Sequence, residues 1–244
     1  MTMIHANWPV AANIEAFTTT RLEGYSISPY QSNNLAFHVG DDDNTVYKNR
    51  LMLQTYLSMN AKIEWLDQTH STDVIRIETD SHRRADAMIT KTPNTFLAIL
   101  TADCLPIMLA HNKGLEVANI HAGWRGLLNG IIQNTVLKLS YPACEYSAYI
   151  GPAICHRCFE VGEEVKVAFM ETLTDMTTPW CNSKDEKWLL NLSQIAEYML
   201  HSMGLKKVIQ SNLCTYENDD RFFSYRLEGQ TGRIASVIGI QPLT

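Results

Sequence analysis

The sequence predicts an α+β (mixed α/β) fold: a single layered domain over residues 1–244, in which mixed β-sheets are flanked by helices. Three observations predict it. Short apolar runs typical of strands recur along the chain, stretches of helical periodicity lie between them, and no repeat, low-complexity tract or linker divides the chain. Its 244 residues, 45% of them hydrophobic, are enough for one large core. We expect the functional site at strand-end loops, where rigid scaffolds usually present their chemistry.

The first half of the chain begins with a predicted helix over 43–57, DNTVYKNRLMLQTYL, capped by Asp43 or Asn44. Val46, Arg50, Leu53 and Leu57 recur at helical spacing and share one face. Branched or alternating apolar residues then predict four strands, at 63–66, 73–78, 96–100 and 115–120.

The second half alternates the two kinds of element. Helical periodicity predicts helices over 127–139, 161–171 and 192–203, the last of which stops at Gly204. Strands are predicted at 147–150, 206–210 and 235–240. Helices and strands are therefore interleaved, as a layered fold requires.

Charge and composition exclude several classes of protein. The net charge is -6 and the Lys and Arg residues are scattered, so the basic footprint of a nucleic-acid-binding protein is missing. No apolar stretch approaches 18 residues, and the first residues do not follow the pattern of a secretory signal. Six scattered cysteines do not form a disulfide scaffold. We expect a cytoplasmic protein that acts on a small molecule, away from membranes.

Three residues with metal-binding side chains follow predicted strands. His70 lies in IEWLDQTHS, Cys104 lies in FLAILTADCLP within a turn closed by Pro106, and His121 lies in LEVANIHAGWRG. If these three loops leave one sheet, they bring two imidazoles and a thiolate together, which is a three-ligand zinc set with a fourth position free for water or substrate.

Other interpretations of these residues stay open. They are 34 and 17 positions apart, and no short metal motif covers them. Singly, His70 is also typical of a surface turn, Cys104 of a small buried residue and His121 of a core histidine. Without a metal, Cys104 is a potential thiolate nucleophile with His70 or His121 as its base, as in a cysteine hydrolase. A non-catalytic binding protein is a further alternative.

Several longer segments carry a resemblance: FTTTRLEGYSISPYQSNNLAFHVGDD, LDQTHSTDV, TADCLPIML, NIHAGWRG, YIGPAICHRCFEVGEEV and CTYENDDRFFSYRLEGQTGR. Together they make the chain resemble the family variously labelled peptidoglycan editing factor, laccase-domain (multicopper polyphenol oxidase-like) protein and purine nucleoside phosphorylase. The resemblance covers nearly the whole chain. This sequence departs from the family's pattern at Glu23–Gly24 and in the loop that carries Cys155 and His156.

The resemblance implies that His70, Cys104 and His121 bind a catalytic metal, usually Zn²⁺, with Cu²⁺ as an alternative. It also implies phosphorolysis of adenosine, inosine and 5'-methylthioadenosine, with some adenosine deamination. The alternative activity is that of a Cys/His amidase, which removes a wrongly added amino acid from a peptidoglycan precursor, UDP-MurNAc-amino acid. A copper polyphenol oxidase is disfavoured, because none of the eight histidines forms an HxH pair.

Phosphorolysis needs cationic side chains for phosphate and groups that read the nucleoside. Arg21 and Arg125 are the arginines that we predict to hold the anion, ahead of Arg226 and Arg233. The residues expected to line the substrate pocket, each with a structural alternative, are Asn34, Gln68, Asp103 and Trp124. Cys155 and Cys158 form a CxxC motif without a second pair, which makes metal or redox function there the weaker interpretation.

Overall fold

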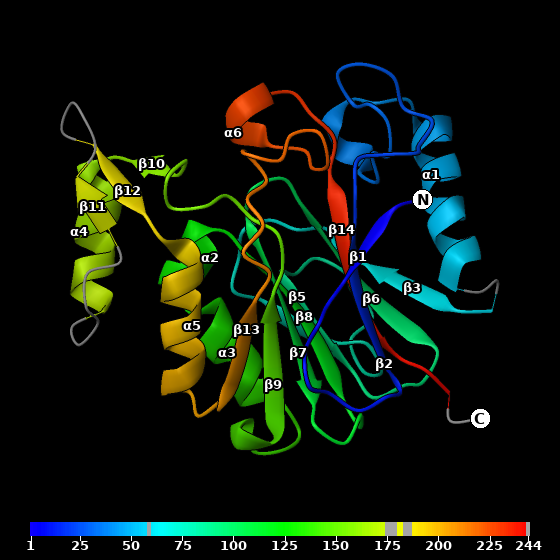
Figure 1. Ribbon diagram of the computed structural model, residues 1–244. Coiled ribbons are helices and arrows are strands. Elements are labelled where there is room, and N and C mark those ends of the chain that lie inside the picture. The colour runs from blue at the N-terminus through cyan, green and yellow to red at the C-terminus, as the bar shows by residue number, and fades with distance from the viewer. Residues whose placement is uncertain (58–59, 174–179, 183–186, 243–244) are drawn as a thin grey trace.

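The computed structural model describes residues 1–57, 60–173, 180–182 and 187–242. It confirms the mixed α+β fold: two large β-sheets lie face to face, and helices cover their outer faces (Figure 1). Within the described part of the chain, no helix has the length and apolar character needed to cross a bilayer. The assignment of residues 1–244 to a single domain stays a prediction.

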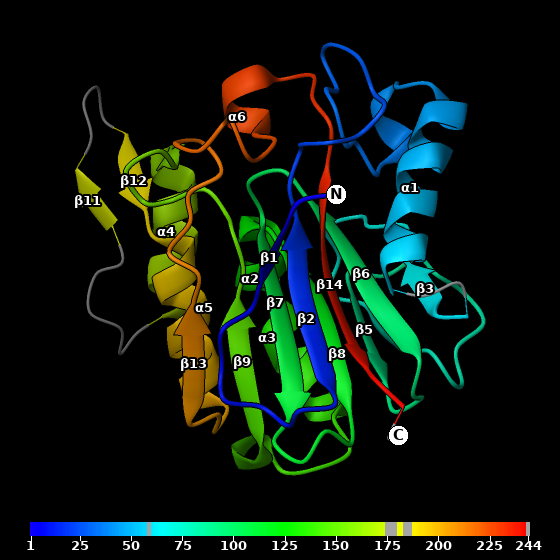
Figure 2. The same ribbon diagram turned by 45° about the vertical axis from the view of Figure 1, so that its right-hand side comes forward.

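The first sheet has five strands in the order β1-β2-β14-β6-β3. Their bounds are Met3–His5 (β1), Ile14–Thr19 (β2), Ile234–Ile240 (β14), Thr95–Thr101 (β6) and Lys62–Trp65 (β3). All neighbours run antiparallel except β3 and β6, which are parallel. Helix α1, Asp43–Leu57, covers the outer face of this sheet (Figure 2).

The second sheet has six strands in the order β13-β9-β7-β8-β5-β4. Their bounds are Lys207–Gln210 (β13), Tyr146–Ile150 (β9), Leu105–His111 (β7), Val117–Ala122 (β8), Ala87–Thr90 (β5) and Val74–Arg76 (β4). The outermost pair at each edge is parallel and the central pairs are antiparallel. Strands β7 and β8 are buried along their whole length, because the first sheet covers one face and helices cover the other.

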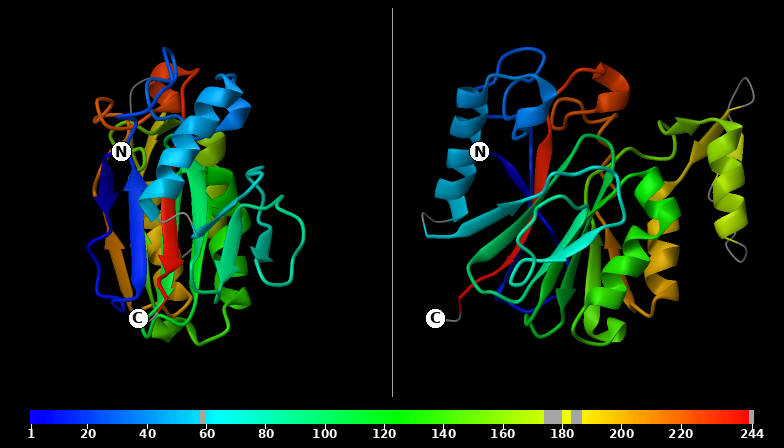
Figure 3. Two further views of the ribbon diagram at one scale, coloured as in Figure 1. Left: turned by 90° about the vertical axis from the view of Figure 1, so that its right-hand side faces the viewer. Right: turned by 180° about the vertical axis from the view of Figure 1, so that it is seen from behind.

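Three apolar clusters hold these layers together. Between the sheets, Leu97 and Ile99 of β6 belong to the same cluster as Met108 of β7 and Val117 of β8. The outer face of the six-stranded sheet packs against α2 (Trp124–Asn129), α3 (Ile131–Lys138) and α5 (Leu192–Ser202), seen on the viewer's side of the sheet in the right-hand view of Figure 3. The third cluster lies under α1.

The remaining elements lie at the ends of the layers. A third sheet, in the order β10-β12-β11, comprises Glu160–Val161 (β10), Trp188–Leu190 (β12) and Trp180–Asn182 (β11). It lies with α4, Glu163–Thr172, to one side of the main body (Figure 1). Short helices are η1 (Phe37–Val39), η2 (Ala143–Glu145) and α6 (Tyr225–Glu228).

All seven predicted strands exist within a few residues of their expected bounds, and the first predicted helix has the bounds of α1. The residue that caps this helix is Asp42, directly before the expected Asp43 and Asn44. The Asp42 carboxylate accepts a hydrogen bond from the Thr45 amide at 2.8 Å. The helix expected over 127–139 is two helices, because Gly130 takes a left-handed φ of 95° between α2 and α3.

The turn expected to close at Pro106 was also wrong, since Pro106 lies inside β7, paired with His121 of β8. The chain passes there from the five-stranded sheet to the six-stranded sheet. The sequence did not predict β7, nor β5, which lies on the other side of β8 in the same sheet.

Candidate functional site

His70 lies in the loop that follows β3, with a left-handed φ of 59°. The Asp86 carboxylate holds this loop: it accepts hydrogen bonds from the backbone amides of Thr69, His70 and Ser71 at 3.2, 3.0 and 2.6 Å, and from the Ser71 hydroxyl at 2.8 Å. Asp86 itself is fully buried, directly before β5. The carboxylate therefore fixes the backbone on which His70 stands.

Cys104 lies at the crossing between β6 and β7, after Asp103, whose φ is 93°. The Asp103 carboxylate accepts hydrogen bonds from the Thr215 hydroxyl at 2.6 Å and from the Arg226 amide at 2.7 Å. Both partners come from the chain between β13 and β14. Asp103 thus ties the Cys104 turn to that segment through both of its carboxylate oxygens.

His121 is the penultimate residue of β8, buried between its neighbours. Its Nδ1 lies 2.8 Å from Oδ1 of Asp86, and its backbone amide donates to the Asp86 carbonyl at 2.7 Å. Because Nδ1 is engaged, Nε2 is the ring nitrogen left for another partner. One carboxylate therefore orients both histidines, and the sequence analysis missed it.

These elements bring the three predicted ligands together. The Cys104 sulfur lies 3.9 Å from Nε2 of His70, the two imidazole rings lie 4.7 Å apart, and one ligand atom of each residue falls within 4.8 Å of the other two. The expectation of loops leaving one sheet was wrong: β3 belongs to the first sheet, β8 to the second, and Cys104 lies between them.

Gly123 leaves the space that this cluster needs. A Cβ atom at Gly123 would lie 3.0 Å from the Cys104 sulfur and 3.1 Å from Cδ2 of His70, closer than ordinary van der Waals contact. The glycine after His121 therefore has a steric reason: its backbone passes directly beside two of the three side chains.

The cluster is electrostatically coupled. Burial alone raises the pKa of the Cys104 thiol, but the charges and hydrogen bonds of His121 and His70 outweigh it and lower that pKa to about 6. For His121, burial lowers the pKa, but Cys104 and Asp86 outweigh it and raise that pKa to about 9. At neutral pH the group is thus a thiolate beside an imidazolium, with the Asp86 carboxylate behind it.

This donor set fits a metal ion. Two imidazoles and a thiolate are the ligands that zinc prefers, and a carboxylate on the far nitrogen of a histidine is the usual support for such a ligand. His70 is exposed and Cys104 half-buried, so one side of the cluster is open. A three-residue set that is open on one side is typical of catalytic rather than structural sites.

The predicted site residue Arg21 is bonded to the protein itself. The Arg21 guanidinium donates to the carbonyls of Gln31, Asp219 and Phe222 and pairs with Glu228 at 2.9 Å, so its nitrogens are already engaged. We therefore correct the expectation that Arg21 holds an external anion.

The two predicted amides are likewise engaged. Gln68 bonds the Leu100 backbone through both its oxygen and its nitrogen, at 2.8 Å each. Asn34 is fully buried, and its oxygen accepts from the Ala36 amide at 3.0 Å and from the Arg233 amide at 2.9 Å. We therefore correct the expectation that these amides line the pocket.

Arg125 and Arg233 were also named as candidate anion ligands, and their surroundings differ. Arg125 is exposed four positions after His121, and its guanidinium lies 4.3 Å from the centre of the half-buried Trp124 ring. Arg233 donates through Nη1 to the carbonyls of Thr231 and Gly232. Burial lowers the pKa of Arg233, and the negative charges of Cys104 and Asp103 offset part of that shift.

Comparison with known proteins gives consistent matches. The pattern that defines the multi-copper polyphenol oxidoreductase laccase family matches residues 15–241. A Haemophilus influenzae protein named purine nucleoside phosphorylase is 40% identical over 98% of this chain and 99% of its own. The Shigella flexneri protein named purine nucleoside phosphorylase YfiH is 39% identical over 97% of this chain and 98% of its own.

Solved structures agree. The crystal structure of a Neisseria meningitidis protein of family DUF152 superposes with a TM-score of 0.94, at 38% identity, over 99% of this chain and 100% of its own. YlmD from Geobacillus stearothermophilus gives a TM-score of 0.93 at 28% identity, over 99% of this chain and 97% of its own.

Proposed function

The chain belongs to the multi-copper polyphenol oxidoreductase laccase family, and within that family we propose that it is a metal-dependent purine nucleoside phosphorylase with its active site at His70, Cys104 and His121. Relatives that carry the phosphorylase name match it over nearly their whole length. The single observation that carries the proposal is the convergence of these three side chains, with Asp86 behind the histidines.

We propose adenosine, inosine and 5'-methylthioadenosine as substrates, with phosphate as the acceptor and slower deamination of adenosine at the same site. As the glycosidic bond breaks, positive charge develops on the ribose and negative charge on the purine. A zinc ion, or alternatively copper, held by His70, Cys104 and His121 would supply a Lewis acid beside the developing negative charge. The thiolate of Cys104 needs a reducing compartment, so we propose a cytoplasmic location.

The chain's own residues supply the rest of the site. Arg125 is exposed four positions after His121, so its planar guanidinium is available to bind two phosphate oxygens. Arg233 is positioned by Asn34 and adds a second positive charge. The Arg125 guanidinium lies over one face of the half-buried Trp124 ring, and the purine would stack beside this pair. Asp86 keeps the free ring nitrogen of His121 directed at the cluster.

The test is chromatography of adenosine, inosine and 5'-methylthioadenosine incubated with the purified protein, with and without phosphate. We expect free base and ribose phosphate only when phosphate is present, and at least a hundredfold lower rate for Cys104→Ala. Cys144→Ser is the matched control, because Cys144 is an exposed cysteine outside the cluster. Base release that does not need phosphate, or full activity in Cys104→Ala, would contradict the proposal.

A second candidate function rests on one observation, the chain of contacts from Asp86 through His121 to Cys104, with a thiol pKa of about 6. This is the arrangement of a cysteine hydrolase, in which the thiolate attacks a carbonyl and the imidazolium protonates the leaving amine. The substrate class would be the amide of a peptidoglycan precursor. Amide cleavage that survives metal removal but stops after thiol alkylation would favour it over phosphorolysis.

A further inference from the structure

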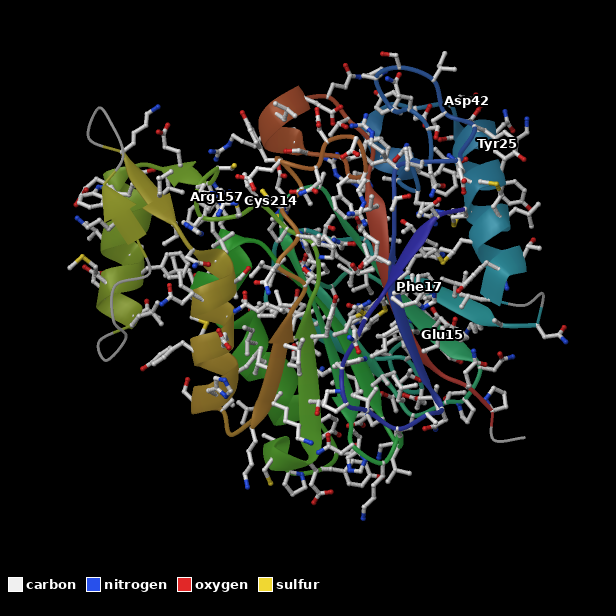
Figure 4. The ribbon with its side chains drawn as sticks, viewed as in Figure 1. Glu15, Phe17, Tyr25, Asp42, Arg157 and Cys214 are labelled. Atoms are coloured by element: carbon white, nitrogen blue, oxygen red, sulfur yellow. The ribbon has the colours of Figure 1, made fainter. Side chains whose placement is uncertain are left out.

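A second group of sulfur ligands lies apart from the site described above. Cys155, Cys158 and Cys214 place their sulfur atoms within 4.8 Å of one another, and the sulfurs of Cys155 and Cys158 are 3.6 Å apart. Figure 4 labels Cys214 and its neighbour Arg157 where the chain leaves the main body towards α4. The first two cysteines are only three residues apart, but Cys214 is brought to them by the fold.

The backbone holds this group in a defined geometry. The amides of Cys158 and Phe159 both donate to the Cys155 carbonyl at 3.0 Å, which makes a tight turn of the CxxC motif. A parallel bridge between Ala153 and Cys214 joins the two segments. The Cys155 amide also donates to the Cys214 sulfur at 3.2 Å, a bond that stabilises negative charge on that sulfur.

We propose that the thiolates of Cys155, Cys158 and Cys214 bind a structural zinc ion, with the Glu217 carboxylate as the fourth ligand. Zinc–sulfur bonds of ~2.3 Å in a tetrahedron place two sulfurs ~3.8 Å apart, close to the observed separation. Oε1 of Glu217 lies 3.8 Å from the Cys158 sulfur. Soft thiolate donors select zinc over calcium or magnesium.

Arg157 has a defined place in this arrangement. Its Nη2 and Nε donate to the two oxygens of Glu217 at 2.6 and 3.0 Å, so the carboxylate is held in position before an ion arrives. Three thiolates and a carboxylate carry more negative charge than one zinc ion neutralises, and the guanidinium offsets part of the excess. A cavity of about 270 Å³, lined in part by Cys155, His156 and Cys214, gives the ion a path from solvent.

A dithiol redox pair is the competing explanation, and it fits less well. Such a pair uses two sulfurs, so it gives Cys214 no role. Redox CxxC motifs also begin a helix, whose N-terminus lowers the thiol pKa, whereas Cys155–Cys158 forms a turn before β10.

The proposed zinc ion would brace one wall of the first site. Ile154, next to Cys155, donates its amide to the Asp103 carbonyl at 3.0 Å, and Thr215, next to Cys214, donates to the Asp103 carboxylate. Both segments that meet at the three cysteines therefore also hold the Cys104 turn. The second site does not depend on which reaction the first one catalyses.

The test is zinc and cobalt binding to the full chain, stripped of metal and kept reduced. We expect about two zinc ions per chain for the wild type, about one for Cys155→Ser/Cys158→Ser, and about one for His70→Ala/Cys104→Ala. Cys144→Ser is the control and should keep both. Glu217→Gln should weaken the second zinc at least tenfold in a chelator competition.

The cobalt spectrum keeps the proposal falsifiable if the double cysteine variant fails to fold. Charge-transfer absorption rises with the number of thiolate ligands. After two equivalents of cobalt, the wild type should therefore absorb as expected for four thiolates, one at the first site and three at the second. Absorption that saturates after one equivalent with a single thiolate would overturn the proposal. So would a Cys155–Cys158 disulfide found by mass spectrometry in protein purified without added oxidant.

Discussion

Asp86→Asn is the most informative single substitution, because one buried carboxylate holds both histidines of the first site. The carboxylate accepts hydrogen bonds from three backbone amides and one hydroxyl and contacts Nδ1 of His121. Asparagine keeps the size but has one acceptor oxygen instead of two, and its amide nitrogen faces donors. We expect a loss of both stability and metal affinity.

The loss of stability follows from the Asp86 pKa. Burial raises this pKa, but the hydrogen bond and charge of His121, and then the bonds from Ser71, outweigh it and lower the pKa from 3.8 to about 2. A shift of that size corresponds to about 2.5 kcal/mol of folding free energy at neutral pH. For a chain of this length, the melting temperature should fall by about 5–10 °C.

The pH dependence has a defined sign. The folded pKa is lower than the unfolded one, so the carboxylate stabilises the fold above pH 3.8 and loses that effect as pH falls towards 2. The difference in unfolding free energy between wild type and Asp86→Asn should be constant from pH 5 to 7 and shrink below pH 4. Urea unfolding at a series of pH values measures it.

Metal affinity separates a positioning role for Asp86 from a purely structural one. Removal of such a support typically lowers affinity by about 10- to 100-fold. Chelator competition should show this loss of affinity for the zinc ion that depends on Cys104. Asp73→Asn is the control, because Asp73 is an exposed aspartate three residues after His70, and it should change neither zinc affinity nor stability. Unchanged zinc affinity in a destabilised Asp86→Asn protein would refute the reasoning about the histidines.

Three further substitutions test the site. Gly123→Ala should lower zinc affinity at the first site at least tenfold, measured by the same competition, because its Cβ would meet Cys104 and His70 at 3.0 and 3.1 Å; equal affinity would contradict the steric argument. Arg125→Ala should raise the KM for phosphate at least tenfold and leave the melting temperature unchanged, since Arg125 is exposed; an unchanged KM would remove it from the phosphate site. Arg21→Ala should lower the melting temperature, because it removes a donor from the buried Phe222 carbonyl. Any loss of rate should match the loss of folded protein in parallel activity and circular dichroism measurements.

The elements that the sequence predicted well are those whose pattern is local. The bounds of α1 follow from a capped stretch with one apolar face, and β6 and β8 follow from continuous apolar runs. The strand β7 was missed because Pro106 suggests a turn. Proline is tolerated there because β7 begins at Leu105, and the first positions of a strand can lack one amide donor.

The site residues could be predicted from the sequence, but the carboxylate that orients them could not. His70, Cys104 and His121 were identified because three metal-binding side chains follow predicted strands and the family resemblance implies a metal there. The sequence did not show that two sheets present them. Asp86 was missed because it follows Arg83 and Arg84 in a polar run, which reads as a solvated turn. Its only local signal is its position directly before the apolar strand β5.

The arrangement of the two buried aspartates explains why an open, three-ligand site can exist between two sheets. Asp86 satisfies its acceptor oxygens with the backbone of the His70 loop and with His121, and Asp103 satisfies its own with Thr215 and Arg226. Each carboxylate therefore fixes part of the cluster through bonds that do not need an ion. Because the ordering cost is met during folding, ion binding has only to displace protons and water, and the same preorganisation serves a thiolate nucleophile. Geometry alone is thus compatible with both candidate reactions, and phosphate dependence is the measurement that separates them.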